Sequence, residues 1–315
     1  MAQRDDGVSP EVVVVGAACL DIKARLRGDT LANTSNAGEV RVSVGGCGRN
    51  IAENLARLGL PTALISVVCP DDFGRTIIGQ TKQAGVIVDG YMLETCESHS
   101  AAYIALYGPQ AQLLVGVDDT EPIAALTPDV ILAHAEQLAA ARMVVIDANV
   151  PLASAEVLLA ICRDAGVPVA VDTVAYAPAL RYRPLIGSFY LVVSNSVEAQ
   201  ALTGHPVADV AQGIVAAREL VACGVEVAIV TLGEAGLVYA TPDASGHIPA
   251  IEVEIVDPTG AGAALTAAVV YALLNDIPVD EAVRLGVSAA TLTLDSDETV
   301  RQDLTLENLY AQLVI

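Results

Sequence analysis

The chain has 315 residues, 53% of them apolar, so it can bury a substantial core in one large α/β domain or two smaller ones. With two Phe and no Trp, that core consists of Ala, Val, Leu and Ile, as in layers of sheet and helix. The formal net charge of −22 argues against a general nucleic-acid or anionic-membrane binder. A small phosphate pocket remains compatible with this charge, because helix N-termini and bound metal ions supply local positive potential.

The cysteines and the first residues predict an intracellular protein. No Cys-x-x-Cys pair occurs, which disfavours zinc and disulfide frameworks and favours buried free thiols in a reducing cytosol for Cys19, Cys47, Cys69, Cys96, Cys162 and Cys223. Residues 1–10 lack the charge and apolar pattern of a signal peptide. The longest uncharged apolar stretch, Ala261–Leu274, is too short to span a bilayer. We therefore expect a cytoplasmic protein.

Strand and helix patterns alternate along the chain. Apolar runs typical of buried strands occupy residues 12–15, 63–68, 143–146, 167–171, 189–193 and 228–232. Helical patterns occupy 51–59, 153–165, 263–274, 279–294 and 304–313, with further helix starts near 71 and 128. A run of β-type residues at Ile251–Val256 precedes the helix at 263–274. This alternation predicts an α/β fold with a mainly parallel sheet covered by helices on both faces.

Three further segments predict a small sheet apart from the main one. Glu39–Val44 alternates as a half-exposed strand does, and Ala101–Tyr107 and Gln112–Val117 form a hairpin around Gly108. By position this sheet, from about 38–45 and 98–117, is a lid. No linker divides the chain, so we expect one domain over residues 1–315. An apolar lid sheet with an exposed edge commonly pairs with its twin, which predicts a homodimer through the lid.

Two elements near the N-terminus could hold a ligand. Asp21 lies just past the first strand, at the sheet edge where α/β proteins bind ligands, and suits hydrogen bonding to paired hydroxyls. Residues 45–50 (GGCGRN) form a Gly-rich turn that lets a ligand approach the backbone, and Asn50 can donate to and accept from a hydroxyl. The structural alternatives are a turn cap for Asp21 and a loop hinge for the glycines.

Two later elements have chemistry suited to phosphate and metal. Residues 257–262 (DPTGAG) form a Gly-rich turn before a helix, so converging backbone amides and the helix dipole make an anion hole. Asn195 and Glu198 lie on one face of a helix start, where both can reach a phosphate or a metal-bound water. A packing turn and a capping box are the structural alternatives.

Together these elements resemble the ribokinase-like sugar and nucleoside kinases, the phosphofructokinase-B family. Gly16 with Asp21, the turn at 45–50, Asn195 with Glu198, and the turn at 257–262 occur in the family's order over essentially the whole chain. Within the family, the chain is most similar to pseudouridine kinases. That similarity rests on Arg49 before Asn50, on the lid segment Ser98–Leu106 and on the tail at 292–300.

The resemblance implies a three-layer ribokinase-like fold and ATP-dependent, Mg²⁺-assisted phosphorylation of a ribose 5′-hydroxyl. Pseudouridine is the first candidate substrate, with ribose, fructose and adenosine as alternatives. By position, the resemblance implies that the substrate binds at Asp21, Gly45, Gly46, Arg49 and Asn50, and the nucleotide at Asn195, Thr231, Gly233, Gly236, Gly260 and Gly262. It implies an anion hole formed by Gly260, Ala261 and Gly262. It also implies that Asn195 and Glu198 bind Mg²⁺ through water, and that a monovalent cation such as K⁺ binds at Asp257 and Thr259 with the segment 295–298.

One position departs from the family. The residue after Gly-Ala-Gly is the family's general-base Asp, whereas this chain has Ala263, which cannot accept a proton. Three explanations are open: an engineered variant that traps ligands, a natural member that has lost catalysis and kept binding, or partial substitution by another carboxylate such as Asp21. In the first two cases the chain binds ATP and nucleoside but phosphorylates poorly, since general-base catalysis is worth ~10²–10⁴-fold.

Two other classes of function compete with a kinase. A non-catalytic ligand sensor would use the same pocket and lid, and turnover together with binding separates it from an enzyme. A dinucleotide-dependent oxidoreductase shares the α/β alternation, but the first turn lacks Gly-x-Gly-x-x-Gly and the expected acidic residue downstream. The sequence therefore favours the kinase reading over the oxidoreductase.

Overall fold

A computed structural model of the chain describes residues 9–95, 99–110 and 112–313. Its centre is a nine-stranded sheet with the strand order β13-β12-β11-β10-β9-β8-β1-β4-β5. The strands, in that spatial order, are β13 (Ser245–Ile248), β12 (Leu237–Ala240), β11 (Val227–Thr231), β10 (Leu191–Asn195), β9 (Val169–Asp172), β8 (Met143–Asp147), β1 (Val12–Val15), β4 (Thr62–Val68) and β5 (Met92–Glu94). Strands β11 to β5 are parallel, and β12 and β13 add an antiparallel hairpin at one edge.

The central strands are apolar because both faces of the sheet are covered. All four valines of β1 are fully buried between β4 and β8. A fully covered parallel strand loses the polar alternation of a half-exposed one, so the continuous valine run predicts it. The expected α/β fold with a mainly parallel sheet is confirmed.

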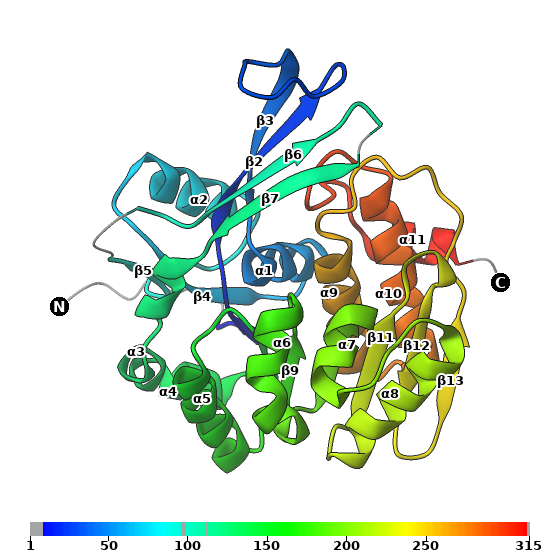
Figure 1. Ribbon diagram of the computed structural model, residues 1–315. Coiled ribbons are helices and arrows are strands. Elements are labelled where there is room, and N and C mark those ends of the chain that lie inside the picture. Colours follow the sequence, from blue (N-terminus) through cyan, green and yellow to red (C-terminus); the bar gives the residue numbers. More distant parts are fainter. Residues whose placement is uncertain (1–8, 96–98, 111, 314–315) are drawn as a thin grey trace.

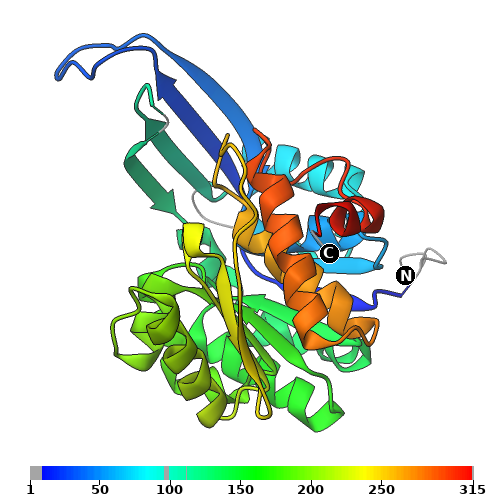
Figure 2. The same cartoon turned by 90° about the vertical axis from the view of Figure 1, so that its right-hand side faces the viewer.

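Helices form a layer on each face of the sheet (Figures 1 and 2). One layer packs on Val13 and Val15 and contains α3 (Pro128–Ala133), α4 (Ala135–Ala140), α5 (Leu152–Ala165), α6 (Tyr176–Tyr182), α7 (Ser196–Thr203) and α8 (Val210–Ala222). The other packs on Val12 and Val14 and contains α1 (Cys47–Arg57), α2 (Asp72–Gln83), α9 (Ala261–Leu274) and α10 (Val279–Leu294), with α11 (Leu306–Gln312) outside α10. Short 3₁₀ helices are η1 (Glu121–Ala125), η2 (Arg183–Ser188) and η3 (Gly233–Ala235).

A second sheet of four strands projects from the body (Figure 2). Its order is β3 (Gly38–Gly45), β2 (Cys19–Leu26), β6 (Ala102–Tyr107) and β7 (Leu113–Asp119). The segments at 38–45 and 98–117, from which we predicted a lid, therefore do contain strands. Ser98 and Ala111 of these segments lie outside the described residues. Strand β2 was not predicted, although Leu20, Ile22 and Ala24 alternate with polar residues as a half-exposed strand requires.

Two sequence-based boundaries are wrong. Helix α1 begins at Cys47 rather than Ile51, so Arg49 and Asn50 belong to its first turn. Ile251–Val256 forms no strand. The backbone N–H of Val256 donates instead to the carbonyl of Leu294 at the end of α10 (2.9 Å). The end of this segment is therefore bonded to a helix and not to a strand.

The expectation of buried free thiols holds for Cys19 and Cys162, whereas Cys47 is free but only half-buried and Cys223 is free but exposed. It is wrong for Cys69, which is disulfide-bonded; Cys96 lies outside the described residues. No helix in the described part of the chain combines the length and apolarity needed to cross a membrane. The cytoplasmic location stays a prediction.

Candidate active site

The predicted site residues gather around the carboxyl ends of the parallel strands. Asn195 ends β10 and is the register partner of Thr231, which ends β11. Two buried acids that we did not assign to the site, Asp147 and Asp172, end β8 and β9 and are also register partners. Parallel strands thus bring these four side chains to one edge of the sheet, where open α/β sheets bind ligands.

The Gly-rich turn at 45–50 packs directly against the end of β1 and against β2. Gly46 has φ +97°, and a Cβ there would overlap the carbonyl of Ala17. A Cβ on Gly45 would overlap the carboxylate of Asp21. These glycines therefore do two things: they permit the left-handed turn that starts α1, and they bring the backbone against Asp21.

Asp147 holds the two N-terminal turns together. Its Oδ2 accepts hydrogen bonds from the N–H groups of Ala17 and Gly48 (both 2.7 Å), and its Oδ1 accepts one from Asn149 N–H (2.9 Å). Burial raises its pKa to about 6 even though these three donors favour the charged form. Because its acceptors are engaged by backbone, Asp147 positions the turns rather than binding a ligand.

Asp21 is almost fully buried yet only partly satisfied. The thiol of Cys19 donates to its Oδ1 (3.2 Å), and Oδ2 has no hydrogen-bond partner among the described residues. Burial raises its pKa from the usual value. An acceptor in this state has capacity left for a hydroxyl, and the role of Asp21 in substrate binding stays a prediction.

Arg49 lies in a buried network along α1. It forms an ion pair with Glu53, which also pairs with Arg57 (2.6 Å). Its Nη1 donates to Asn50 Oδ1 (3.1 Å) and contacts the carbonyl of Val44 at the end of β3 (3.5 Å). The Arg49 guanidinium thus contacts the backbone of the small sheet and orients the Asn50 side chain. Its charge is compensated by Glu53 of the same helix.

Asn195 and Glu198 form the capping box that we named as the structural alternative. Glu198 Oε2 accepts from Asn195 N–H (2.9 Å) and Thr173 Oγ1 (2.8 Å), while Oε1 accepts only from Asn195 Nδ2 (2.6 Å). Burial, and then the charge of Asp172, raise the pKa of Glu198 to about 7. The free lone pair on Oε1 fits a Mg²⁺ bound through water and phosphate.

Asp257 is neutralised by a side chain of the small sheet. Lys23 Nζ on β2 pairs with its Oδ2 (2.6 Å), and Thr259 N–H donates to its Oδ1 (2.8 Å). Burial raises the pKa of Asp257, but these hydrogen bonds outweigh burial and hold the pKa below its usual value. The Asp257 carboxylate is therefore already paired within the chain, and the K⁺ site at Asp257 and Thr259 stays a prediction.

The turn at 257–262 approaches the tail of the chain very closely. Gly260 has φ +91° and caps α9, and a Cβ there would overlap the carbonyl of Thr299. Thr299 in turn donates from Oγ1 to the carbonyl of Val44 (3.2 Å). Gly262, in contrast, has nothing within 4 Å of a Cβ. The turn thus combines a tightly packed start with open space at the first amides of a 14-residue helix.

Ala263 lies in the first turn of α9 and is 6% exposed. One turn further, Thr266 Oγ1 donates to Asp172 Oδ2 (2.9 Å), and Asp172 Oδ1 accepts from Val174 N–H (3.0 Å). The acids at the ends of β8 and β9 are therefore already engaged.

The predicted nucleotide side is a tight turn after β11. Leu232 N–H donates to Gly236 O (2.7 Å), which closes the turn around η3. Gly236 has φ +87° and would overlap Ile248 O if it carried a Cβ, whereas Gly233 has φ +60° and open surroundings. Thr231 lies at the start of this turn, so the three predicted residues are adjacent.

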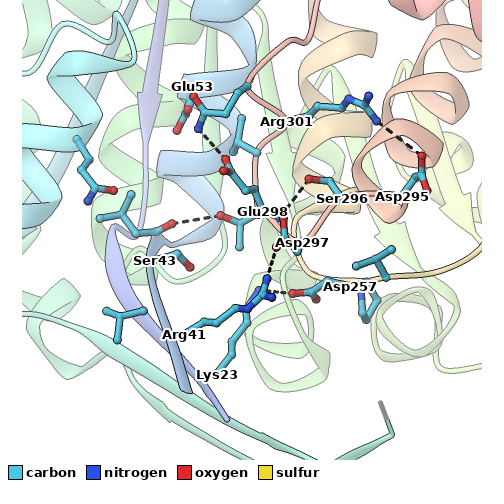
Figure 3. A pocket seen from close by; sticks show the side chains of 18 of the residues that line it. Lys23, Arg41, Ser43, Glu53, Asp257, Asp295, Ser296, Asp297, Glu298 and Arg301 are labelled. Carbon is cyan, nitrogen blue, oxygen red and sulfur yellow. Dashed lines mark hydrogen bonds and ion pairs between the residues drawn. The ribbon is translucent and has the colours of Figure 1, made fainter. Parts of the chain in front are cut away.

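A cavity of about 1020 Å³ adjoins this site and shares Arg49 and Asp257 with it (Figure 3). It is lined by β3, by Asp257 and by the tail at 295–303, but by neither Asp21 nor Ala263. Its charges are largely paired within the chain, as in Arg41 with Asp297 and Arg301 with Asp303. We therefore place the chemistry at the sheet edge and not in this cavity.

Comparison with known proteins identifies the family. Residues 9–304 match the family described as pfkB family carbohydrate kinase. The chain belongs to this family. It is 29% identical to the pseudouridine kinase of Escherichia coli K12, over 95% of each chain. It is 30% identical to the guanosine-inosine kinase of Exiguobacterium acetylicum, over 91% of this chain and 95% of that one.

Solved structures agree on the fold. The Arabidopsis thaliana ribokinase complexed with ribose and ATP superposes with a TM-score of 0.84 at 22% identity, covering 98% of this chain and 100% of that one. The predicted resemblance is confirmed, and the chain is a member of a family of carbohydrate kinases that is similar to nucleoside kinases.

Proposed function

We propose that this protein binds MgATP and a ribose-containing nucleoside, with pseudouridine as first candidate, and transfers the γ-phosphoryl group slowly to the 5′-hydroxyl. The observation that carries the proposal is the pair of Gly-rich turns at one sheet edge. One turn packs on the half-satisfied acid Asp21, and the other opens a helix N-terminus at Gly260. In this proposal the chain is one domain with the small sheet as its lid.

Each turn has a separate task in this mechanism. Asp21, with the backbone of Gly45 and Gly46 and the amide of Asn50, holds ribose hydroxyls. Gly260, Ala261 and Gly262 direct helix-terminal amides at the transferred phosphoryl group, where negative charge develops. When bound, Mg²⁺ neutralises phosphate charge, and Asn195 and Glu198 hold its waters. Thr231, Gly233 and Gly236 border the nucleotide.

A ligand sensor is the second candidate function, and Ala263 is the observation that favours it. A methyl group at the family's base position leaves the phosphate turn and the Asp21 site intact, so binding survives without efficient transfer. The kinase proposal requires measurable ADP release with a nucleoside. The sensor proposal requires tight nucleoside binding without turnover, even after an acid is restored at position 263.

The proposal predicts selective thermal stabilisation by nucleosides. In the presence of Mg²⁺ and a non-hydrolysable ATP analogue, pseudouridine is expected to raise the Tm most in a panel with ribose, fructose, uridine, adenosine, guanosine and inosine, because a ligand that binds only the folded state stabilises it. Coupled ADP release with the same panel measures turnover. A panel in which neither the ATP analogue nor any sugar or nucleoside shifts the Tm would contradict the proposal.

We also propose that the protein is a homodimer through the outer face of the small sheet. The register aligns Val42, Ile22, Ile104 and Val117 in one row across its four strands. Val42, Ile104 and Val117 are 59%, 46% and 54% exposed, which is unusual for adjacent β-branched side chains of a monomer. A second copy of the same face would bury this row.

Ile104→Asp is expected to convert a dimer into a monomer in sedimentation velocity, because it places two carboxylates in a desolvated interface. Leu132→Asp is the matched control, since Leu132 is 53% exposed on α3 and lies outside the row. It should leave the sedimentation coefficient unchanged. A wild-type protein that sediments as a monomer at tens of micromolar overturns this proposal.

A further inference from the structure

The inner face of the small sheet carries a row of polar and aromatic side chains. Register partners across β2, β6 and β7 are Asp21, Tyr103 and Asp118, and partners in register point to the same face. Lys23 lies on this face as well, two residues beyond Asp21. Its Nζ donates to Asp257, the first residue of the Gly-rich turn at 257–262. The row formed by Asp21, Tyr103 and Asp118 therefore faces the proposed active site.

Tyr103 extends across the neighbouring strand. The partner of Ala105 on β7 is Gly116, and a Cβ on Gly116 would lie 3.0 Å from the hydroxyl oxygen of Tyr103. The hydroxyl end of the Tyr103 ring thus lies over Gly116, where the side chain of any larger residue would collide with the ring. Tyr103 is only partly buried, and its hydroxyl has no hydrogen-bond partner among the described residues. A tyrosine ring held across a sheet in this way can serve as a stacking surface for a planar ligand.

Asp118 is an exposed acceptor at the end of the row, on the edge strand β7. It has no ion-pair or hydrogen-bond partner among the described residues, whereas the adjacent Asp119 contacts His99 (3.4 Å). A carboxylate accepts only, so its natural partner is a ligand with N–H or O–H donors. Asp21 is closer to the turn at 45–50 and is already assigned to the ribose.

We infer that Tyr103 and Asp118 form a nucleobase subsite, in which the base stacks on Tyr103 and its N–H edge donates to Asp118. The inference rests on the proposed function and deepens it, because a free sugar would leave both side chains without a contact. It makes the substrate a nucleoside rather than ribose. Among uracil nucleosides it favours a C-linked one, whose ring has an N–H group where N-linked uridine has its glycosidic bond.

Calorimetry with ribose, uridine and pseudouridine tests the subsite on binding alone, in the presence of Mg²⁺ and a non-hydrolysable ATP analogue. Tyr103→Ala is expected to weaken pseudouridine binding roughly 5- to 150-fold, the range for loss of base–aromatic stacking, and to leave ribose binding unchanged. Tyr103→Phe should retain most of the affinity. Asp118→Asn should weaken pseudouridine about 10-fold or more and uridine less, because it converts a charged acceptor into an amide.

Tyr310→Ala is the control, since it removes a 40% exposed tyrosine of α11 whose hydroxyl donates to Glu281 of α10 (2.9 Å) and not to the small sheet. It should bind all three ligands as wild type does. Equal losses of ribose and pseudouridine in Tyr103→Ala, or wild-type pseudouridine affinity in both Tyr103→Ala and Asp118→Asn, overturn the subsite while the kinase proposal stands. If the wild type binds no ligand of the panel and no ATP analogue, both fail together.

Discussion

Ala263→Asp is expected to raise the rate of nucleoside phosphorylation by ~10²–10⁴-fold, the usual contribution of a positioned general base. The substituted position lies in the first turn of α9, beside the open space at Gly262. That turn contains no acidic residue, and a carboxylate there is favoured by the positive end of the helix dipole. The added carboxylate would face the site between the two Gly-rich turns. It would supply the proton acceptor that the backbone amides of the anion hole cannot provide. Steady-state ADP release with pseudouridine measures the gain.

Ala263→Asn is the matched control, because an amide has nearly the same shape and accepts no proton. It should bind the nucleoside as the Asp variant does and gain little in kcat. Equal gains from Asn and Asp would show that hydrogen bonding to the hydroxyl, not proton transfer, was missing. No gain from Asp, with nucleoside and ATP still bound, would refute the role assigned to position 263 and favour the sensor. If Asp21→Asn then abolished residual turnover without weakening binding, Asp21 would be the substituting base.

The layered fold was predictable because its strands are uniformly apolar. Val12–Val15 and Met143–Ile146 have no polar face, which only a covered parallel strand tolerates. Strand β2 was missed because Asp21 was placed in a turn just past the first strand, although it lies on the inner face of a second strand. Ile251–Val256 was assigned a strand from β-branched content alone. Propensity does not say whether a neighbouring strand has an edge available.

The site was predictable where function depends on backbone geometry. Gly46 and Gly260 both need left-handed φ values and close approach to other chain segments, so glycine at these positions is informative. The pairing of Lys23 with Asp257 was not predictable, because 234 residues separate the two side chains and only the placement of the small sheet brings them together. Asp147 and Asp172 were visible as strand-terminal acids. Their hydrogen-bond partners, which decide that they are structural, were not.

Gly260→Ala is expected to weaken ATP binding at least about 10-fold and to destabilise the fold. An alanine at φ +91° costs ~1–3 kcal/mol in backbone strain alone, and its Cβ would overlap Thr299 O. Thr299 cannot retreat freely, since its hydroxyl is bonded to the end of β3 at Val44. A loss of about 2 kcal/mol lowers the Tm by roughly 3 °C in a chain of 315 residues. Thermal unfolding and titration with an ATP analogue measure the two effects.

Gly262→Ala separates the two effects, because Gly262 has no left-handed φ and nothing within 4 Å of its Cβ. Its Tm should stay within about 1 °C of wild type, since an alanine in a helix costs no strain and gains helix propensity. If the open space beside Gly262 holds the transferred phosphate, the added methyl group will still weaken ATP binding. Unchanged ATP affinity in Gly262→Ala would place the phosphate elsewhere along the turn. Unchanged ATP affinity in both variants would remove the helix terminus from the mechanism, because Gly260→Ala distorts its first amides whatever the ligand does.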